Sequence, residues 1–308
     1  MKHEVIVIGA GPAGLTAALY LARYRRDVLV LHDGKSRALR IPKTHNAPGF
    51  PDGVEGPELI ERMIGHATSF GARIEEAHVT GVTRKKGGFE VTSEDGGTWT
   101  ARAVILASGI LLNQVDLPHE VHEQAIKDDV LRYCPICDGY EHSDRKIGVV
   151  GCDSNGAAEA LFLRQFSSDI TLMPLHNSEL SKAQLRELAE AGITVRHGSL
   201  VHLDPQADCM KVMLEGENQA MSFDVVYPAL GCSPRAELAA ALGLKLNDEG
   251  CIPGSALKGD EVAGFFAAGD VLEGLDQISV AMGHGAQAAT NAHNWLREQD
   301  NETLEATS

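Results

Sequence analysis

Short apolar runs followed by glycine-rich turns form the main pattern of this chain. Val5–Ile8 is entirely apolar, and the turn GAGPAG and the apolar helical stretch Leu15–Ala22 follow it directly. A run without polar alternation is typical of a strand buried on both faces, as in a parallel sheet. The order therefore predicts a strand, a tight turn and a helix, and Val28–Leu31 predicts the next strand of a βαβ unit.

The same pattern returns twice further along the chain. Ile147–Val150, a glycine-containing turn, Ala157–Phe166 and a strand from Ile170 to about Leu175 predict a second βαβ unit. Near the end, Phe265–Ala268 precedes a Gly-Asp pair and a helix predicted over Ser279–Leu296. We therefore expect an α/β fold made of two Rossmann-like three-layer domains.

A predicted hairpin lies between these two units. Phe89–Thr92 and Thr98–Leu106 have the composition of strands, and the polar turn Glu94–Gly97 separates them. The sequence Ala-Ser-Gly at positions 107 to 109 closes the second strand. We expect both strands to extend the first domain.

The first glycine-rich turn has the residues that a dinucleotide requires. Gly9 permits the tight turn, Gly11 lets the backbone approach a pyrophosphate, and Gly14 allows the helix to pack closely on the strand. The helix N-terminus offers its N–H groups to phosphate. Asp33 ends the second strand, about 20 residues past the glycines, where an acidic residue binds a ribose hydroxyl. A turn without a ligand is the alternative, which the complete βαβ context disfavours.

Length and charge narrow the class of protein. A chain of 308 residues is long enough for two domains. The formal net charge of −16 disfavours binding to nucleic acid or to an anionic membrane, because both attract clustered Lys and Arg. The N-terminus lacks a basic segment followed by a long apolar one, and no apolar run approaches membrane-spanning length. We therefore expect a cytoplasmic protein.

Two of the six cysteines lie close together in the sequence. Cys134 and Cys137 have a spacing at which two thiols can close a small ring, and in a reducing compartment such a pair is redox-active or binds metal. Half of a zinc site is the alternative, but the sequence contains no second CxxC and no paired CxxH. Asp138 follows directly and supplies a carboxyl group for proton transfer, although a solvated turn carboxylate also fits a position before glycine.

Four motifs resemble, in order and spacing, those of the low-molecular-weight thioredoxin reductases. They are GAGPAG at positions 9 to 14, ILASG at 105 to 109, CPICDG at 134 to 139 and AAGDV at 267 to 271. The resemblance covers nearly the whole chain. It implies an FAD-binding domain over residues 1–113 and 234–308, interrupted by a pyridine-nucleotide-type domain over 114–233 that carries the cysteine pair. It also implies a homodimer.

The resemblance further implies roles for the cysteine pair and its neighbour. Cys137 would be the sulfur that faces the flavin, Cys134 the interchange thiol that attacks a partner disulfide, and Asp138 the acid. The expected partner is a thioredoxin-like protein or a small dithiol. No metal ion is expected.

The resemblance also implies a set of FAD contacts. They are Gly9, Gly11, Pro12, Ala13, Gly14, Asp33, Asn46, Val79, Ser108, Gly109, Gly269, Asp270, Gln277 and Ile278. Asn46 would lie near the flavin ring, and Asp270 would hold the ribitol. Gln277 and the Ile278 amide would approach the isoalloxazine, while the Val79 backbone would meet the adenine.

The second glycine-rich turn departs from the family pattern. It reads GCDSNG at positions 151 to 156, so Asp153 stands where the second glycine is expected. A side chain there obstructs a pyrophosphate, and a carboxylate adds like-charge repulsion. The next strand is followed by PLHN at 174 to 177 instead of an arginine-rich stretch. NADPH use is therefore doubtful, and the alternative is an altered site in which Asn155 or the Gly156 amide binds the nucleotide.

A basic stretch lies within this acidic chain. Arg23–Lys43 holds seven Lys and Arg residues against two Asp residues. It is either a solvated face with one or two contacts to the FAD pyrophosphate, or a dock for an acidic electron-transfer protein such as ferredoxin or flavodoxin.

Three functions fit the sequence. The leading one is FAD-dependent electron exchange between flavin, the cysteine pair and a protein or small-molecule dithiol, without NAD(P)H. Members of the family that lack the nucleotide site include ferredoxin-linked thioredoxin reductases and oxygen-using dithiol oxidases. The alternatives are an NADPH-dependent thioredoxin reductase and a flavin redox sensor without turnover.

Overall fold

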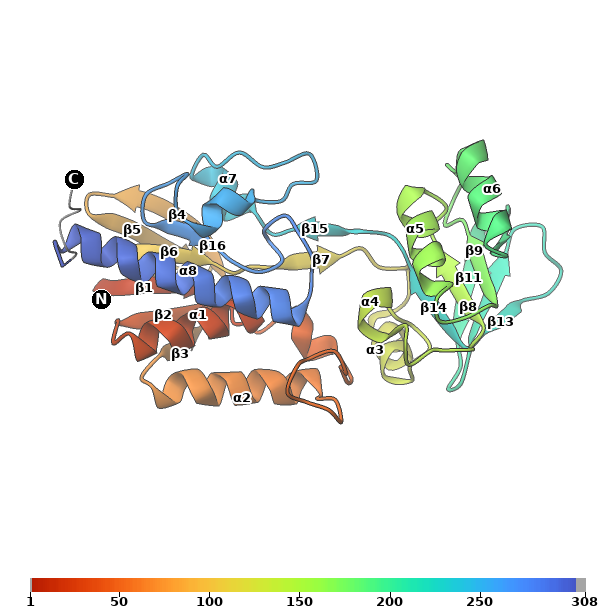
Figure 1. Ribbon diagram of the computed structural model, residues 1–308, viewed down its shortest axis with the longest axis horizontal. Coiled ribbons are helices and arrows are strands. Elements are labelled where there is room, and N and C mark those ends of the chain that lie inside the picture. The colour runs from red at the N-terminus through yellow and green to blue at the C-terminus, as the bar shows by residue number, and fades with distance from the viewer. Residues whose placement is uncertain (1, 303–308) are drawn as a thin grey trace. The chain divides into compact units, whose positions relative to one another are not determined.

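The computed structural model describes residues 2–302 and divides into two compact units. The chain passes from the first unit to the second after Leu111 and returns to the first at Ser233. The crossing strands β7 (Ile110–Leu112) and β15 (Cys232–Pro234) pair with each other as a two-stranded ribbon (Figure 1). The second unit is therefore inserted into the sequence of the first. Of the helices in the described part of the chain, none combines the length and the apolar character that a membrane span needs.

A seven-stranded sheet forms the centre of the first unit. Its strands run in the order β3-β2-β1-β6-β5-β4, and β16 pairs with the end of β6. Strands β1, β2, β3, β6 and β16 are parallel neighbours, whereas β4 and β5 extend the sheet as an antiparallel hairpin. The strand bounds are β1 Lys2–Ile8, β2 Val28–His32, β3 Arg73–Glu76, β4 Val79–Lys85, β5 Gly88–Ser93, β6 Thr98–Leu106 and β16 Phe265–Ala267.

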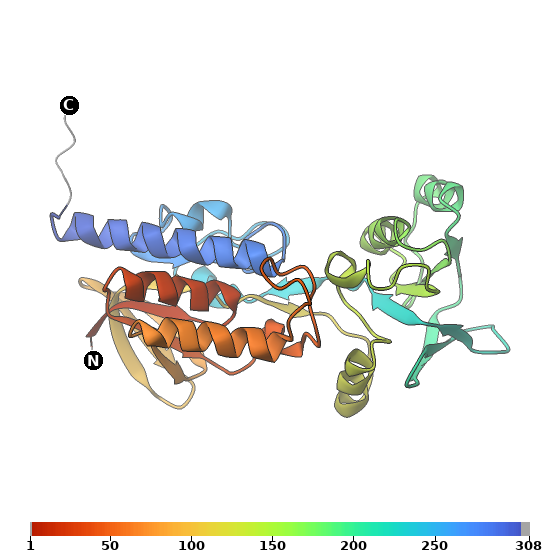
Figure 2. The same cartoon turned by 60° about the horizontal axis from the view of Figure 1, so that its bottom comes forward.

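Three helices cover one face of this sheet. Helix α1 (Pro12–Arg23) lies between α2 (Gly56–Ser69) and α8 (Ile278–Gln299), as Figures 1 and 2 show. A Cβ at Gly285 would stand 2.2 Å from the Ala13 carbonyl oxygen, so this glycine permits the close approach of α8 to α1. The N-termini of α1 and α8 are thereby held in one packed layer.

The opposite face of the sheet is buried by a second apolar cluster. It includes Phe89 of the hairpin, Phe265 of β16 and residues of the short helix α7 (Glu237–Ala241). Two 3₁₀ turns, η1 (Arg37–Arg40) and η2 (Gly254–Leu257), complete the unit. Since both faces of the central strands are covered, their runs are apolar at every position.

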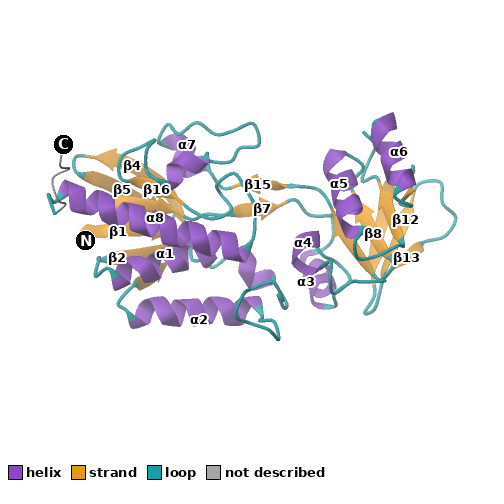
Figure 3. Ribbon diagram, viewed as in Figure 1, coloured by secondary structure: helices purple, strands orange, loops and turns teal. Residues whose placement is uncertain are grey.

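The second unit contains a four-stranded parallel sheet and a three-stranded antiparallel sheet. Their orders are β10-β9-β8-β14 and β11-β12-β13. Helices α5 and α6 lie side by side next to the parallel sheet (Figure 3). The bounds are α3 His119–Lys127, α4 Pro135–Asp138, β8 Ile147–Val150, α5 Ser154–Leu163, β9 Ile170–Met173, α6 Lys182–Glu190, β10 Thr194–Val195, β11 Leu200–Pro205, β12 Met210–Leu214, β13 Met221–Phe223 and β14 Val225–Pro228.

Each unit has its own apolar core. In the second unit, Val149 and Tyr227 face the cluster beneath α5, while Val150 and Val226 face the cluster formed with β12 and β13. The alternation explains why β8 and β14 are buried on both sides. The α/β class with two Rossmann-like units, one inserted into the other, is confirmed.

Candidate active site

Packing within the protein requires two glycines of the first turn but not the third. Gly9 has φ of +112°, and a Cβ there would stand 2.2 Å from the Ala107 carbonyl oxygen. A Cβ at Gly14 would stand 1.9 Å from the Gly9 carbonyl oxygen. At Gly11 the nearest atom is Ser36 Oγ, at 3.3 Å, so the fold alone would admit a small side chain. Glycine at this position instead suits a ligand that approaches the backbone closely.

The start of α1 is open to an anion. Gly11 is the N-cap of this helix, Pro12 is its first residue, and no side chain of residues 2–302 caps its N–H groups. The turn that contains Gly269 packs against the same place, because a Cβ at Gly269 would stand 2.7 Å from the Ala13 Cβ. The first and the last glycine turns therefore meet within the first unit, at a helix start suited to phosphate.

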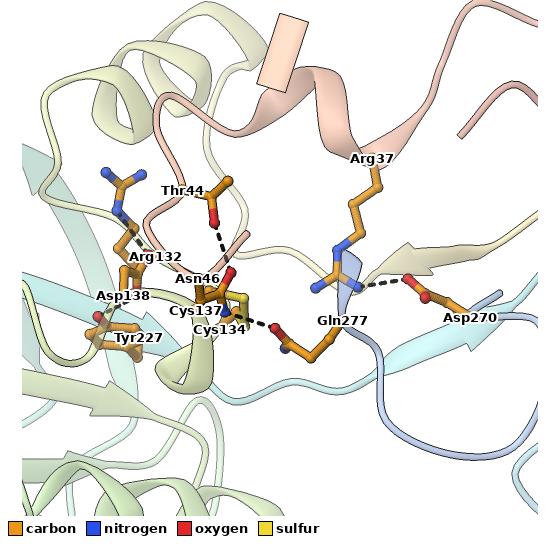
Figure 4. The surroundings of a disulfide bond; sticks show 10 residues. All are labelled: Arg37, Thr44, Asn46, Arg132, Cys134, Cys137, Asp138, Tyr227, Asp270 and Gln277. Atoms are coloured by element: carbon orange, nitrogen blue, oxygen red, sulfur yellow. Dashed lines mark hydrogen bonds and ion pairs between the residues drawn. A yellow bond between two sulfur atoms is a disulfide. The ribbon is translucent and has the colours of Figure 1, made fainter. Parts of the chain in front are cut away.

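The two acidic residues expected at the cofactor each pair with an arginine. Arg235 donates to Asp33 Oδ2 at 2.7 Å, and Arg37 donates to Asp270 Oδ2 at 3.3 Å, the second pair being drawn in Figure 4. Burial alone would raise the pKa of Asp33, but the hydrogen bonds from Arg235 and the Lys35 amide hold it below its usual value. At Asp270 burial outweighs Arg37 and raises the pKa. Arg37 belongs to the basic stretch Arg23–Lys43, whereas no sequence motif indicates Arg235.

Asn46 and Gln277 come together although 231 positions separate them. Asn46 Nδ2 donates to Gln277 Oε1 at 3.0 Å, and the Thr44 hydroxyl donates to Asn46 Oδ1 at 2.8 Å (Figure 4). Gln277 is the N-cap of α8 and Ile278 is its first residue. The pairing joins two residues that the resemblance placed near the flavin ring, and it gives both amides a fixed orientation.

Ser108 and Gly109 hold the segment that carries Arg235. The Ser108 hydroxyl donates to the Arg235 carbonyl at 2.7 Å, and the Arg235 amide donates to the Gly109 carbonyl at 2.9 Å. Gly109 has φ of +69°, which favours glycine. These contacts bring the Arg235 guanidinium to Asp33. Val79 is the first residue of β4 and is buried.

Asp276 is a further acidic residue of this region, and no sequence motif indicates it. Burial, and next the charge of Asp270, raise the pKa of Asp276 to about 6. It directly precedes Gln277 at the start of α8. Nothing in its sequence position distinguishes it from an exposed loop aspartate.

In the second unit, Cys134 and Cys137 form a disulfide, with their Cα atoms 5.3 Å apart. Cys134 is the N-cap of the short helix α4, and Pro135 occupies its first position, where its missing N–H carries no cost. The Cys137 amide donates to the Cys134 carbonyl at 2.9 Å. The helical turn thus brings the two sulfurs within bonding distance, and the disulfide expected from the sequence is confirmed.

Asp138 lies between a tyrosine and an arginine. The Tyr227 hydroxyl donates to Asp138 Oδ1 at 2.7 Å, and Arg132 Nε lies 3.2 Å from Oδ2 (Figure 4). Burial raises the pKa of Asp138 to about 6, against the opposing effects of Tyr227 and Arg132. The side chain is 21% exposed, so Asp138 is not a solvated turn carboxylate. Its carboxyl group populates both protonation states near neutral pH, as a group that gives and takes protons must.

The second glycine turn repeats the geometry of the first with one substitution. Gly151 has φ of +135°, and a Cβ at Gly156 would stand 1.6 Å from the Gly151 carbonyl oxygen. Asp153 is the N-cap of α5, the position that Gly11 has in α1. Its Oδ1 accepts from the Gly156 amide at 2.8 Å. The Asp153 carboxylate therefore already accepts the hydrogen bond of an N–H group that is otherwise available to a phosphate.

The surroundings of this turn are acidic. Burial, and next the charge of Asp153, raise the pKa of Glu159 on α5 to about 7. The loop after β9 is tied to the turn, because the Glu179 amide donates to the Cys152 carbonyl at 2.7 Å. No arginine occurs in the sequence between Arg164 and Arg186. A pyrophosphate at this turn would meet two acidic side chains without the expected arginines.

The basic stretch Arg23–Lys43 is partly neutralised inside the first unit. Arg26 donates to Glu4 at 2.8 Å and is 11% exposed, and Arg37 is paired with Asp270 as described above. Arg23 also lies over the Phe70 ring, 4.7 Å from its centroid, so several of the seven cations are engaged within the unit itself. This leaves a weaker positive surface than the sequence suggested.

The chain matches one family model, described as "Pyridine nucleotide-disulphide oxidoreductase", over residues 3–285. It is 31% identical over 312 residues to a thioredoxin reductase of Mycolicibacterium smegmatis, with 97% of this chain and 98% of the relative covered. It is 33% identical over 306 residues to a thioredoxin reductase of Streptomyces clavuligerus, with 96% and 94% covered. Among solved structures, HlmI has a TM-score of 0.88 and 29% identity, with 98% of this chain and 94% of that chain covered.

Proposed function

The chain belongs to the pyridine nucleotide-disulphide oxidoreductase family and is a flavin disulfide oxidoreductase acting on sulfur groups, and from this premise we propose a specific reaction. The protein exchanges electrons between FAD, the Cys134–Cys137 disulfide and a dithiol, without using NAD(P)H. The observation that first points away from NAD(P)H is that Asp153 caps α5 through the Gly156 amide, to which the acidic surroundings and the missing arginines of the same turn add. A thioredoxin-like protein or a small dithiol is the proposed partner, and a homodimer the proposed assembly.

FAD fits the residues of the first unit. The open backbone at Gly11 and the uncapped start of α1 would receive the pyrophosphate. Asp33 and Asp270 would hold ribose and ribitol hydroxyls, and the joined amides of Asn46 and Gln277 would lie at the ring. When bound, FAD supplies a carrier that accepts and releases two electrons. We accordingly assign residues 1–113 and 234–308 to the FAD-binding domain and 114–233 to the domain that carries the cysteine pair.

The cysteine pair performs the sulfur chemistry. A thiolate of the dithiol attacks Cys134 Sγ, the Cys134–Cys137 bond breaks, and Cys137 leaves as a thiolate. The second thiolate of the dithiol attacks its own sulfur in the mixed disulfide, which releases Cys134 and leaves the substrate oxidised. The two electrons of the dithiol then reside on the reduced Cys134 and Cys137 pair, from which bound FAD would accept them. Asp138 supplies and recovers one proton, and the reverse sequence reduces a partner disulfide.

The comparison of α1 and α5 supports the absence of NAD(P)H from this cycle. The two helices begin with turns of the same geometry, but a ligand is free to reach the N–H groups of α1 while a carboxylate binds one at α5. Glu159 adds a second acidic group to the turn. Because pyrophosphate is dianionic, the Asp153 carboxylate opposes its binding, and Glu159 does so in the fraction of molecules in which it is ionised near pH 7.

The second candidate is an NADPH-dependent thioredoxin reductase. It is favoured by the two relatives of that name, which match the chain at 31% and 33% identity over nearly their whole lengths. The two candidates differ in one measurable property, which is the reduction of the bound flavin by nicotinamide nucleotide.

Anaerobic stopped-flow absorbance of the flavin separates these candidates. Dithiothreitol should reduce the flavin rapidly, whereas NADPH and NADH at millimolar concentration should do so far more slowly. Asp153→Gly alone should recover little, because arginines around His176 and Asn177 are missing as well. Reduction of the unmodified protein by NADPH at a rate that matches turnover would overturn the proposal in favour of the second candidate.

A further inference from the structure

Several polar side chains outside the CPICDG motif surround Asp138. Tyr227 comes from β14, and Asp129 and Arg132 come from the segment between α3 and α4. His142 follows α4. Figure 4 shows Tyr227 and Arg132 directed toward the Asp138 carboxyl group from different elements. The position of this acid is therefore determined by the fold of the whole second unit and not by the motif alone.

Tyr227 makes one carboxyl oxygen of Asp138, Oδ1, a hydrogen-bond acceptor. Its hydroxyl donates to Oδ1 at 2.7 Å, and its side chain is fully buried. Burial, and next the Asp138 charge, raise the pKa of Tyr227, so the hydroxyl remains protonated and acts toward Oδ1 only as a donor. The carbonyl oxygen of a protonated carboxyl group is the better acceptor, so the hydrogen bond at Oδ1 favours a proton on Oδ2.

Arg132 is shared between two carboxylates. Its Nε lies 3.2 Å from Asp138 Oδ2, and its NH2 group binds Asp129. Its NH1 group donates to the Ile126 carbonyl at 3.0 Å, which ties the guanidinium to the backbone. Arg132 lowers the pKa of Asp138 and Asp129 raises it. Pairing with Asp129 therefore limits how strongly Arg132 stabilises the Asp138 carboxylate.

Three more titratable or charged groups act on this cluster. His142 is buried, and its Nε2 lies 3.7 Å from Asp129 Oδ1. Burial lowers the pKa of His142, so the ring is neutral near pH 7. Glu141 raises the pKa of Asp138, and Arg145 lowers that of His142. The protonation of Asp138 thus depends on a balance of opposing neighbours.

We propose that Arg132 and Tyr227 are positioning residues, which hold Asp138 so that its Oδ2 exchanges a proton with the Cys134–Cys137 pair. The inference rests on the acid role of Asp138 in the proposed function. As a dithiol opens the Cys134–Cys137 bond, the bonding electron pair leaves with Cys137, and Oδ2 then gives its proton to a thiolate of the pair. The products are a thiol and the Asp138 carboxylate, which Tyr227 and Arg132 stabilise until the pair closes and the proton returns.

The test is the pH dependence of disulfide reduction in the full-length protein. Dithiothreitol reduces the pair, and an alkylating agent traps the new thiols for counting by mass spectrometry. The rate constant, expressed per dithiothreitol thiolate, should fall as pH rises through the pKa of Asp138. Tyr227→Phe should move this fall upward by about one pH unit, because the carboxylate loses a hydrogen bond.

Substitutions at Arg132 and at Asp129 should displace the pH profile of disulfide reduction in opposite directions. Arg132→Gln should move the fall to higher pH, and Arg132→Lys, which keeps the charge, should restore part of the displacement. Asp129→Asn should move it to lower pH, because Arg132 then acts on Asp138 alone. A general loosening of the structure would slow the reaction without producing displacements of opposite sign.

Asp138→Asn and a matched control separate the possible failures. Tyr20→Phe, at a partly exposed tyrosine of α1 in the first unit, should leave the profile unchanged. Asp138→Asn should remove the fall. An unchanged profile in Asp138→Asn would refute the acid role itself. If Asp138→Asn removes the fall while Tyr227→Phe and Asp129→Asn leave it in place, only the positioning proposal is wrong.

Discussion

Gly11 and Asp153 occupy equivalent positions in the two glycine turns, as the N-caps of α1 and α5, but only Asp153 has a side chain. At Gly11 a Cβ would meet only Ser36 Oγ, at 3.3 Å, whereas a Cβ at Gly9 would collide with backbone. Substitutions at Gly11 and at Gly9 should therefore disturb the protein for different reasons. A substitution at Gly11 should weaken binding of the ligand, whereas one at Gly9 should prevent folding.

We expect Gly11→Val to fold but to bind far less than the one FAD per chain expected of the unmodified protein, because its side chain fills the space of the pyrophosphate. Gly9→Val should not yield a folded protein, since φ of +112° and a backbone contact of 2.2 Å both exclude a side chain. Flavin absorbance per chain and far-UV circular dichroism distinguish the two effects. Stoichiometric FAD in Gly11→Val would refute the assignment of the pyrophosphate to this turn.

The two sulfurs should also be separable by substitution. Cys137→Ser should block electron flow between flavin and dithiol. Cys134→Ser should leave a thiolate beside the flavin and a long-wavelength charge-transfer band. The absorbance spectrum of each variant checks this assignment. A band in Cys137→Ser instead would mean that the two roles are reversed.

At the scale of the element, the contribution of the Asp153 N-cap to helix α5 can be measured by substitution. Asp153→Ala should lower the free energy of unfolding by about 1 kcal/mol, because the Gly156 amide loses its acceptor, whereas Asp153→Asn should retain most of it. Urea unfolding followed by circular dichroism measures both. Equal stability of Asp153→Ala and the unmodified protein would show that the cap contributes nothing.

The sequence predicted most of the central strands and helices, because these are continuous apolar runs between glycine turns. It was less accurate at the ends of elements. The strand expected to reach about Leu175 ends at Met173, since Pro174 has no N–H for the ladder. The helix expected over Ala157–Phe166 runs instead over Ser154–Leu163, because the Asp153 cap starts it three residues earlier.

The site was predictable where its chemistry lies in one short motif. The glycine turns and the CPIC pair are of this kind. The partners of the acidic groups were not, because Tyr227 lies 89 positions from Asp138 and Arg235 lies 202 positions from Asp33. Such pairs form only when elements that are distant in the sequence pack together in the fold, which a single sequence does not reveal.

At the scale of the whole molecule, the second unit is one continuous segment with two apolar clusters of its own. We therefore expect residues 112–232, expressed alone, to fold, to form the Cys134–Cys137 disulfide and to bind no flavin. Circular dichroism, thiol counting and absorbance check the three parts. A disordered segment would show that this unit depends on the rest of the chain.

Raised carboxyl pKa values should make stability fall as pH rises. The folded protein raises the pKa of Asp138 to about 6 and that of Glu159 to about 7, from 3.8 and 4.5. The folded state therefore binds more protons than the unfolded chain between these values, so stability is lost with increasing pH. The lowered pKa of Asp33 acts in the opposite sense, but only at and below about its ordinary value of 3.8. The lowered pKa values of His142 and His293 also act in the opposite sense, at and below about their ordinary value of 6.5, so they reduce the expected trend without acting above that pH.

We accordingly expect a lower Tm at about pH 8 than at about pH 5, and Glu159→Gln should remove roughly 1–3 kcal/mol of the difference. Glu187→Gln, at an exposed position of α6, is the matched control. Thermal unfolding of the three proteins at both pH values is the measurement. A Tm that rises with pH, or an equal effect of both substitutions, would contradict the linkage.

The Asp153 cap can also be regarded as a covalently tethered competitor of any phosphate at α5. Its effective concentration is set by the backbone and cannot be diluted away, but a cap worth about 1 kcal/mol weakens a competing ligand only about fivefold. That factor is too small to abolish nucleotide binding by itself. The Asp153 cap, the partial charge of Glu159 and the missing arginines would then each contribute to the exclusion of NAD(P)H. No single reverse substitution could therefore restore nucleotide binding.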